Sequence, residues 1–134
     1  MQEGLIQLKK KVRLALAAAK DKLAEDPVAL NLKGIASFTD SFIICGGAQR
    51  RQTQAICDAI VEALGREGEK PGHIEGYALG EWILIDFADL VVHVFTRDTR
   101  GFYNLERLWG DAPAFVSDSP KSRKNSEAPA ILKG

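Results

Sequence analysis

The chain has 134 residues, a length typical of one globular domain built around a single hydrophobic core. Its 18 Lys and Arg residues balance 18 Asp and Glu residues, which argues against a protein that holds nucleic acid mainly through its phosphates. Hydrophobic residues make up 46% and charged residues 27%, so the composition excludes a largely disordered chain. A folded domain without sequence-specific nucleic-acid binding is expected.

Apolar runs and cysteines indicate the compartment. The longest apolar runs hold about half a dozen residues, as in 14–19, whereas a membrane-spanning helix needs roughly 20. The two cysteines, Cys45 and Cys57, lie in apolar segments and are too few for a disulfide framework. The sequence therefore predicts a cytoplasmic protein that does not cross a membrane.

The first half of the chain predicts a helix, two strands and a second helix. Apolar residues recur every three or four positions over residues 5–24, which is typical of an amphipathic helix. Pro27 ends this helix, and residues 28–32 form a short strand. Residues 42–45 are apolar on both alternating faces, as in a central strand whose sheet is covered on both sides. A helical stripe follows over about 49–66.

The second half predicts a hairpin and a final helix. A brief extended piece is expected around 73–75. The β-rich runs 82–87 and 90–95 are separated by only two residues, which favours an antiparallel hairpin. Apolar residues at helical spacing predict a helix over about 100–109.

These elements define the expected fold class and domain organisation. They predict an α/β domain over residues 1–116, with a mixed sheet of about five strands flanked by helices. Residues 117–134 are rich in Ser, Pro and Lys and are expected to form a disordered tail.

The turn at Gly46-Gly47 is a possible ligand site. A strand that leads through glycines into a helix can present free backbone N–H groups to an anion. Neither the P-loop motif nor the dinucleotide motif is present, and paired glycines at a turn more often permit a positive φ. A nucleotide site at this turn is therefore the alternative to a purely structural role.

The titratable residues do not form a catalytic pattern. Asp86 and Asp89 are three apart, so on an extended strand they would not share a face, and Asp89 suits a turn. A two-residue hairpin loop would place His93 opposite Trp82 or Leu84 and on the face of Asp86, which allows an Asp–His contact.

A nucleophile and a metal site are also disfavoured. A buried, hydrogen-bonded structural His93 is favoured over a reactive pair with Cys45. The set Cys45, Cys57, His73 and His93 lacks the short paired spacing of structural zinc sites. We expect no catalytic residue, no cofactor and no metal.

Aromatic residues are concentrated between positions 75 and 109. They are Tyr77, Trp82, Phe87, Phe95, Phe102, Tyr103 and Trp109. Exposed aromatic side chains beside charges commonly anchor protein interfaces, whereas the alternative is that all of them belong to the core. The pattern favours an interface.

Four segments together resemble one known family. They are SFTDSFIICGG (37–47), EG (75–76), WILIDFADLVVHVF (82–95) and FYNLERLW (102–109). The chain resembles the ribosomal silencing factors, also called the Iojap-like family, over about residues 5–113. It departs from the family at Gly47, near which many members carry polar residues, and in the tail after Val116.

The resemblance implies a fold and a function. It implies a fold related to nucleotidyltransferases but without the catalytic carboxylates. Such proteins bind the large ribosomal subunit through its fourteenth ribosomal protein and block joining with the small subunit, especially when nutrients are limiting. The chain would then be a translational repressor rather than an enzyme, and a possible homodimer when free. A nucleotidyltransferase-like enzyme and a homodimer without a ribosomal role are the alternatives.

The resemblance also implies which residues contact the partner. Trp82 and Phe87 on the hairpin, with Tyr103, Leu105 and Trp109 of the last helix, match the family's partner-binding surface. Five further residues match family motif positions as contacts or scaffold: Asp40, Glu75, Asp86, Asp89 and His93. Residues 71–96 contain four acidic residues and no Lys or Arg, which would suit a basic ribosomal protein.

Overall fold

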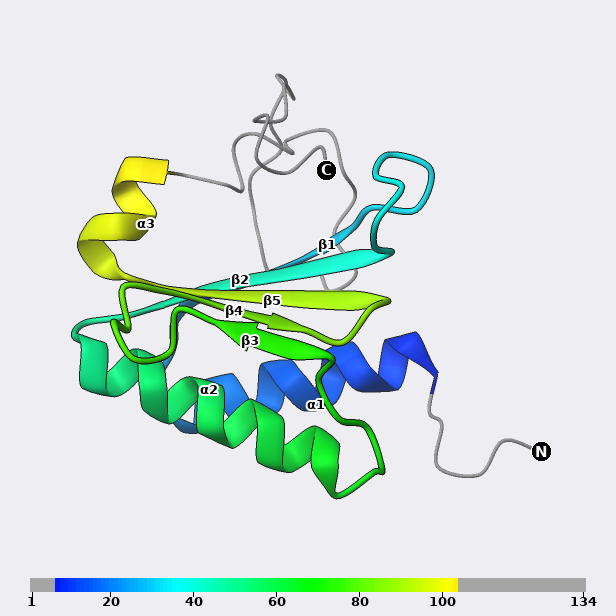
Figure 1. Cartoon of the computed structure of the whole chain (residues 1–134), viewed down its shortest axis with the longest axis horizontal. Helices are drawn as coiled ribbons and strands as arrows, with labels where there is room; N and C mark the ends of the chain where they lie inside the picture. The colour runs from blue at the N-terminus through cyan, green and yellow to red at the C-terminus, as the bar shows by residue number, and fades with distance from the viewer. Residues whose placement is uncertain (1–6, 104–134) are drawn as a thin grey trace.

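The computed structural model describes residues 7–103 as three helices and one five-stranded sheet (Figure 1). This confirms the expected α/β domain with a mixed sheet. The elements in chain order are α1 (Leu8–Asp21), β1 (Glu25–Asn31), β2 (Ser41–Gly47), α2 (Arg50–Gly65), β3 (His73–Glu75), β4 (Trp82–Asp86), β5 (Leu90–Thr96) and α3 (Arg97–Tyr103). None of the described helices is long and apolar enough to span a bilayer.

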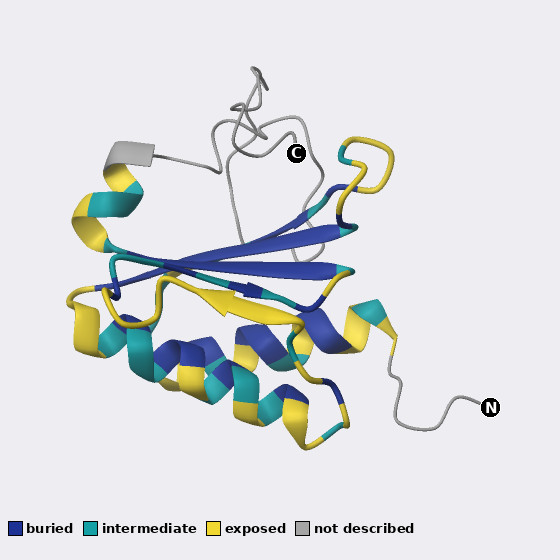
Figure 2. Cartoon of the chain, in the orientation of Figure 1, coloured by how far each residue is buried: buried dark blue, intermediate teal, exposed yellow. Residues whose placement is uncertain are grey.

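The strand order is β1-β2-β5-β4-β3. Strands β2 and β5 pair in parallel, and the other neighbours pair antiparallel. Every residue of β2 is buried, as expected for a strand inside a covered sheet. The short strand β3 is exposed along its whole length and forms one edge (Figure 2).

Helices α1 and α2 lie together on one face of the sheet (Figure 1). The apolar stripe of α1 includes the fully buried Ala15 and Ala19, and that of α2 includes Ile56 and Ile60. These side chains pack with alternate residues of the strands, such as Ile43, in one cluster. The amphipathic spacing in the sequence therefore determines which face of each helix meets the sheet.

The opposite face of the sheet carries a second apolar cluster. Its members are Leu30, Leu32, Phe42, Ile44, Val91 and Phe95, with the partly buried Val28, Ala36, Trp82 and Leu84 packed against them. Because successive strand residues point to opposite faces, β2 and β5 contribute to both clusters. This explains why their sequences are apolar without alternation.

Strands β4 and β5 form the predicted hairpin. Leu84 lies opposite His93, one of the two pairings expected, and Asp86 lies opposite Val91. The Phe87 N–H donates to the Leu90 carbonyl at 2.8 Å, which leaves a two-residue connection. Ala88 within it adopts a φ of 77°, a conformation that costs a non-glycine residue about 1 kcal/mol or more.

The first helix and first strand have different bounds from those predicted. Helix α1 ends at Asp21 because the next turn forms a Schellman motif, in which Ala24 N–H donates to Ala19 O and Leu23 N–H to Lys20 O. Strand β1 begins at Glu25, before the predicted residue 28, because a register shift between Glu25 and Val28 accommodates Pro27.

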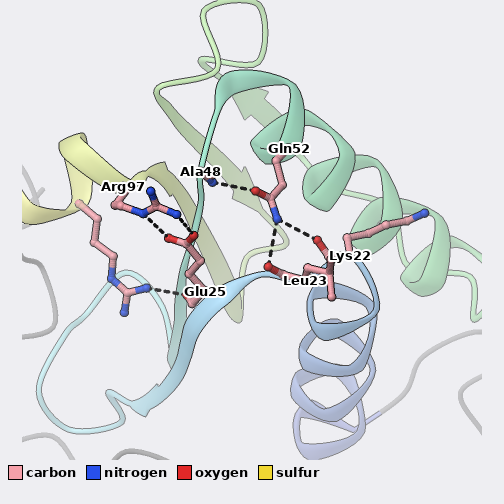
Figure 3. Close-up of polar contacts among 7 residues, drawn as sticks. Lys22, Leu23, Glu25, Ala48, Gln52 and Arg97 are labelled. Atoms are coloured by element: carbon pink, nitrogen blue, oxygen red, sulfur yellow. Dashed lines mark hydrogen bonds and ion pairs between the residues drawn. The ribbon is translucent and has the colours of Figure 1, made fainter.

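Helix α3 begins at Arg97, three residues before the predicted start. The Arg97 guanidinium pairs with the Glu25 carboxylate, with Nε at 3.2 Å from Oε1 (Figure 3). This guanidinium holds the pKa of Glu25 below its usual range. The pair ties the start of α3 to β1, a contact that local periodicity does not reveal. The remainder of the predicted helix, up to residue 109, and the predicted tail lie outside the described residues.

Candidate functional site

The Gly46-Gly47 turn does not have the backbone conformation expected from its glycines. Neither residue has a positive φ, so that expectation is wrong. A Cβ added to Gly47 would lie 3.1 Å from Thr53 Cγ2 and 3.2 Å from the Thr53 nitrogen. Glycine is favoured at position 47 because the end of β2 packs closely against the first turn of α2.

The start of α2 is occupied by the chain's own side chains. The Gln52 amide accepts a hydrogen bond from Ala48 N–H at 2.7 Å and donates to the carbonyls of Lys22 and Leu23 at 3.1 and 3.0 Å (Figure 3). The depression beside it is open and is lined by both basic and acidic residues, including Glu81. This geometry does not favour the nucleotide site considered as the alternative function.

The structure separates Cys45 from His93. Cys45 belongs to the cluster on the helix-covered face, whereas His93 packs against Phe42 on the opposite face, with ring centroids 4.5 Å apart. Burial also raises the pKa of the Cys45 thiol to about 12, so the thiol stays protonated near neutral pH. The favoured interpretation of His93 as a structural residue is consistent with this placement.

The two hairpin carboxylates have separate structural roles. Asp86 Oδ1 accepts a hydrogen bond from Ala88 N–H at 2.8 Å and so caps the turn. Asp89 Oδ1 lies 2.6 Å from Lys11 Nζ, which agrees with its expected place in the turn. The histidine that contacts Asp86 is His73, with Nδ1 at 3.7 Å from Oδ2; the Asp–His contact considered for His93 is not found.

Metal-ligating side chains do not gather in the described part of the chain. Within residues 7–103 no group of three or more His, Cys, Asp or Glu side chains could hold a metal ion.

Trp82 is held by His93 across the hairpin. The half-buried indole donates from Nε1 to His93 Nδ1 at 3.1 Å. Burial lowers the pKa of His93 to about 3, so its ring is neutral near pH 7 and carries its proton on Nε2. That buried Nε2 has no hydrogen-bond partner among residues 7–103. The indole also packs on the Phe95 ring, with ring centroids 4.9 Å apart.

The other residues matched to the family's partner surface have different placements. Phe87 is only 6% exposed and belongs to the core under the helices. It therefore faces away from Trp82 and offers little surface to a partner in this conformation. Tyr103 is the last residue of α3; its side chain, Leu105 and Trp109 lie outside what the structure describes.

The two remaining motif residues, Asp40 and Glu75, differ in their contacts. Asp40 N–H donates to the Asp89 carbonyl at 3.2 Å, so its backbone joins the loop before β2 to the hairpin turn. Glu75 is exposed on the edge strand β3, with Oε2 at 3.3 Å from His73 Nε2. Asp40 is thus a scaffold residue through its backbone, and Glu75 is available for contact.

The sequence analysis did not single out Lys11. The residue is only 4% exposed, and its Nζ lies 3.1 Å from Glu69 Oε1 as well as 2.6 Å from Asp89 Oδ1. Burial lowers the pKa of Lys11, but hydrogen bonds and charges from Asp89 and Glu69 outweigh it and raise the pKa overall. A signal was present, because position 11 falls within the apolar stripe of α1.

The fold and these contacts define a small α/β domain in which Asp86 and Asp89 are held by contacts within the fold and whose Trp82 side offers an aromatic, acidic surface. The sequence model described as "Ribosomal silencing factor during starvation" matches residues 6–132. The chain therefore belongs to the ribosomal silencing factor family, as its motifs indicate.

Individual relatives agree with this assignment. A ribosomal silencing factor from Halalkalibacterium halodurans is 48% identical over 102 residues, covering 76% of this chain and 87% of the relative. One from Bacillus subtilis is 45% identical over 102 residues, covering 76% and 86%. A crystal structure of a protein from Bacillus halodurans matches with a TM-score of 0.71 and 42% identity, covering 81% of this chain and 98% of that one.

Proposed function

We propose that this protein is a cytoplasmic translational repressor that binds the large ribosomal subunit through its fourteenth ribosomal protein. Bound there, it blocks association with the small subunit, especially under nutrient limitation. The names of the relatives support a silencing role at the ribosome. The mechanism is steric occlusion and requires no reaction.

The main observation behind the proposal is that the indole of Trp82 has a fixed orientation and is partly accessible. Tryptophan is enriched among residues that dominate binding energy, particularly where its orientation is fixed before binding. Its hydrogen bond to His93 and its packing on Phe95 fix the ring while leaving part of it accessible. Trp82 is therefore suited to act as the anchor of an interface.

The surroundings of Trp82 indicate the chemistry of the partner. Leu84 and Asp86 follow on the same face of β4, and Glu75 lies opposite Leu84 on β3. The surface is thus apolar at its centre and acidic toward the edge strand. A basic ribosomal protein complements it, whereas exposed RNA phosphates would be repelled.

The size of the domain is sufficient for occlusion. A compact domain of this length has a radius of gyration of about 14 Å. A typical stable interface covers roughly 800 Å² on each partner, which the β4–β5 hairpin together with α3 can supply. A domain held in this way between two subunits prevents their close approach.

The test compares Trp82 with a second aromatic residue that solvent can reach. Trp82→Glu should weaken cosedimentation with purified large subunits at least tenfold, because it places a charge at the anchor. Phe38→Glu changes an aromatic side chain that is 40% exposed, in the loop between β1 and β2, and should bind normally. Circular dichroism checks that both variants fold. Equal cosedimentation of Trp82→Glu and the unaltered protein would show that the proposed face is wrong.

A further inference from the structure

The loop between β3 and β4, residues 76–80, exposes apolar side chains. Leu79 is 61% exposed and Tyr77 is 38% exposed, and Ile74 on the adjoining edge strand is also 38% exposed. Single exposed apolar residues are ordinary, but a group within a few residues of one another is typical of an interaction surface. The 76–80 loop is therefore a candidate contact.

The backbone of the 76–80 loop is fixed by two glycines. Gly76 has a φ of +80°, and a Cβ there would lie 2.1 Å from the Trp82 carbonyl oxygen. Gly80 has a φ of +74°, and its Cβ would lie 3.0 Å from Arg50 Cβ. Gly80 N–H donates to the Gly76 carbonyl at 2.9 Å and closes the loop. Both positions thus combine a left-handed backbone with close packing that only glycine permits.

Side chains of helix α2 form hydrogen bonds with the 76–80 loop. The Gln54 amide donates to the Tyr77 carbonyl at 2.8 Å, and the Thr53 hydroxyl lies 2.6 Å from the Gly80 carbonyl oxygen. The Tyr77 hydroxyl donates to the Asp58 carboxylate at 3.0 Å. Leu79 therefore lies exposed on a loop whose backbone is already restrained. Because the loop is ordered before binding, less conformational entropy is lost when a partner binds.

The position of the loop and its charges indicate what it meets. Its last glycine is followed by Glu81 and Trp82, and Gly76 packs against the Trp82 backbone. The loop itself contacts α2, so it adjoins the Trp82 face around the edge of the sheet. The carboxylates of Asp58, Glu75 and Glu81 lie near it, and Arg50, which packs against Gly80, pairs with Glu81 at 3.0 Å. The charge around the loop is therefore acidic on balance. A partner with an apolar recess bordered by basic side chains complements this surface.

We infer that the 76–80 loop forms a second contact, in which Leu79 enters an apolar recess on the basic protein that the Trp82 face binds. This inference rests on the proposed function. It adds a contact at the edge of the sheet, beside the Trp82 anchor. The side chain at position 79 therefore affects binding with little effect on folding.

The experiment uses two exposed aliphatic residues. Leu79→Ser should weaken binding to purified large subunits roughly fivefold to tenfold, because the loss of most of a leucine side chain removes apolar area from the interface. Ile35→Ser is the control: Ile35 is 46% exposed, in the loop between β1 and β2 at the opposite end of the sheet (Figure 1). Affinities are measured by sedimentation across a range of subunit concentrations, and thermal unfolding is measured for each variant.

The outcomes separate this inference from the proposed function. If Leu79→Ser binds as tightly as the unaltered protein while Trp82→Glu does not, the loop contact is wrong and the proposed function stands. If the unaltered protein fails to bind large subunits, both are overturned. If Leu79→Ser only converts a free dimer into monomers, as sedimentation equilibrium would show, the loop pairs with a second copy and the inference is overturned.

Discussion

The buried imidazole of His93 couples folding to pH. A histidine in the unfolded chain has a pKa of about 6.5, whereas burial lowers the pKa of His93 to about 3. Protonation therefore favours the unfolded state. The contribution of His93 to stability is complete above about pH 6.5 and falls by up to about 1.4 kcal/mol per pH unit as the pH drops toward 3.

This pH dependence can be measured by urea unfolding at about pH 7 and about pH 5. The unaltered protein and His73→Gln, which replaces the exposed histidine, should lose similar stability, and His93→Gln should lose less. NMR titration of the unaltered protein should show a neutral His93 ring at about pH 5. A ring that titrates near pH 6.5 would contradict the assigned burial.

The faces of the sheet on which Trp82 and Phe87 lie could be predicted from the sequence. Alternation along β4 places Trp82 and Phe87 on opposite faces, because five positions separate them. The family resemblance nevertheless matched both to one partner surface, and the structure places Phe87 in the core. The indole–imidazole hydrogen bond was not predictable, because it depends on rotamers and on the register of two strands.

At the scale of elements, Lys11 joins three segments. Its ammonium links α1 to Asp89 in the hairpin turn and to Glu69 in the loop after α2. Lys11→Met should lower the free energy of unfolding by roughly 2–4 kcal/mol, because two carboxylates lose a buried partner. Lys10→Met is the matched control: Lys10 pairs with Glu67 at 3.5 Å on the surface, a contact worth at most about 1 kcal/mol. Denaturant titration that shows equal losses would contradict the structural role of Lys11.

The elements themselves were largely predictable, and their junctions were not. Periodicity identified both long helices and the hairpin, because burial of an amphipathic face determines them. Leu23 at the end of α1 has a φ of 62°, a position where glycine is the usual signal, so no residue marked the end of that helix. The bulge around Pro27 similarly depends on pairing with β2, which local sequence does not contain.

At the scale of the whole molecule, the neutral charge balance conceals an uneven distribution. Helix α1 carries five basic residues and one acidic residue, whereas residues 71–96 carry only acidic charges. Two of those four carboxylates are structural, because Asp86 caps the hairpin turn and Asp89 pairs with Lys11. Glu75 and Glu81 contact His73 and Arg50 at exposed positions, so these two carboxylates are the ones to change when the effect of this segment on binding is tested.

Neutralising these two carboxylates should slow association with the large subunit. Opposite potentials steer encounter and mainly affect the association rate, so Glu75→Gln with Glu81→Gln should reduce that rate severalfold at low salt and change dissociation little. The difference should shrink as salt shortens the Debye length from about 30 Å at 0.01 M to about 8 Å at 0.15 M. Asp21→Asn with Glu62→Gln makes the same change in net charge on exposed positions of α1 and α2. Stopped-flow measurements in which both double variants associate equally fast would show that net charge, rather than the acidic edge of the sheet, controls the encounter.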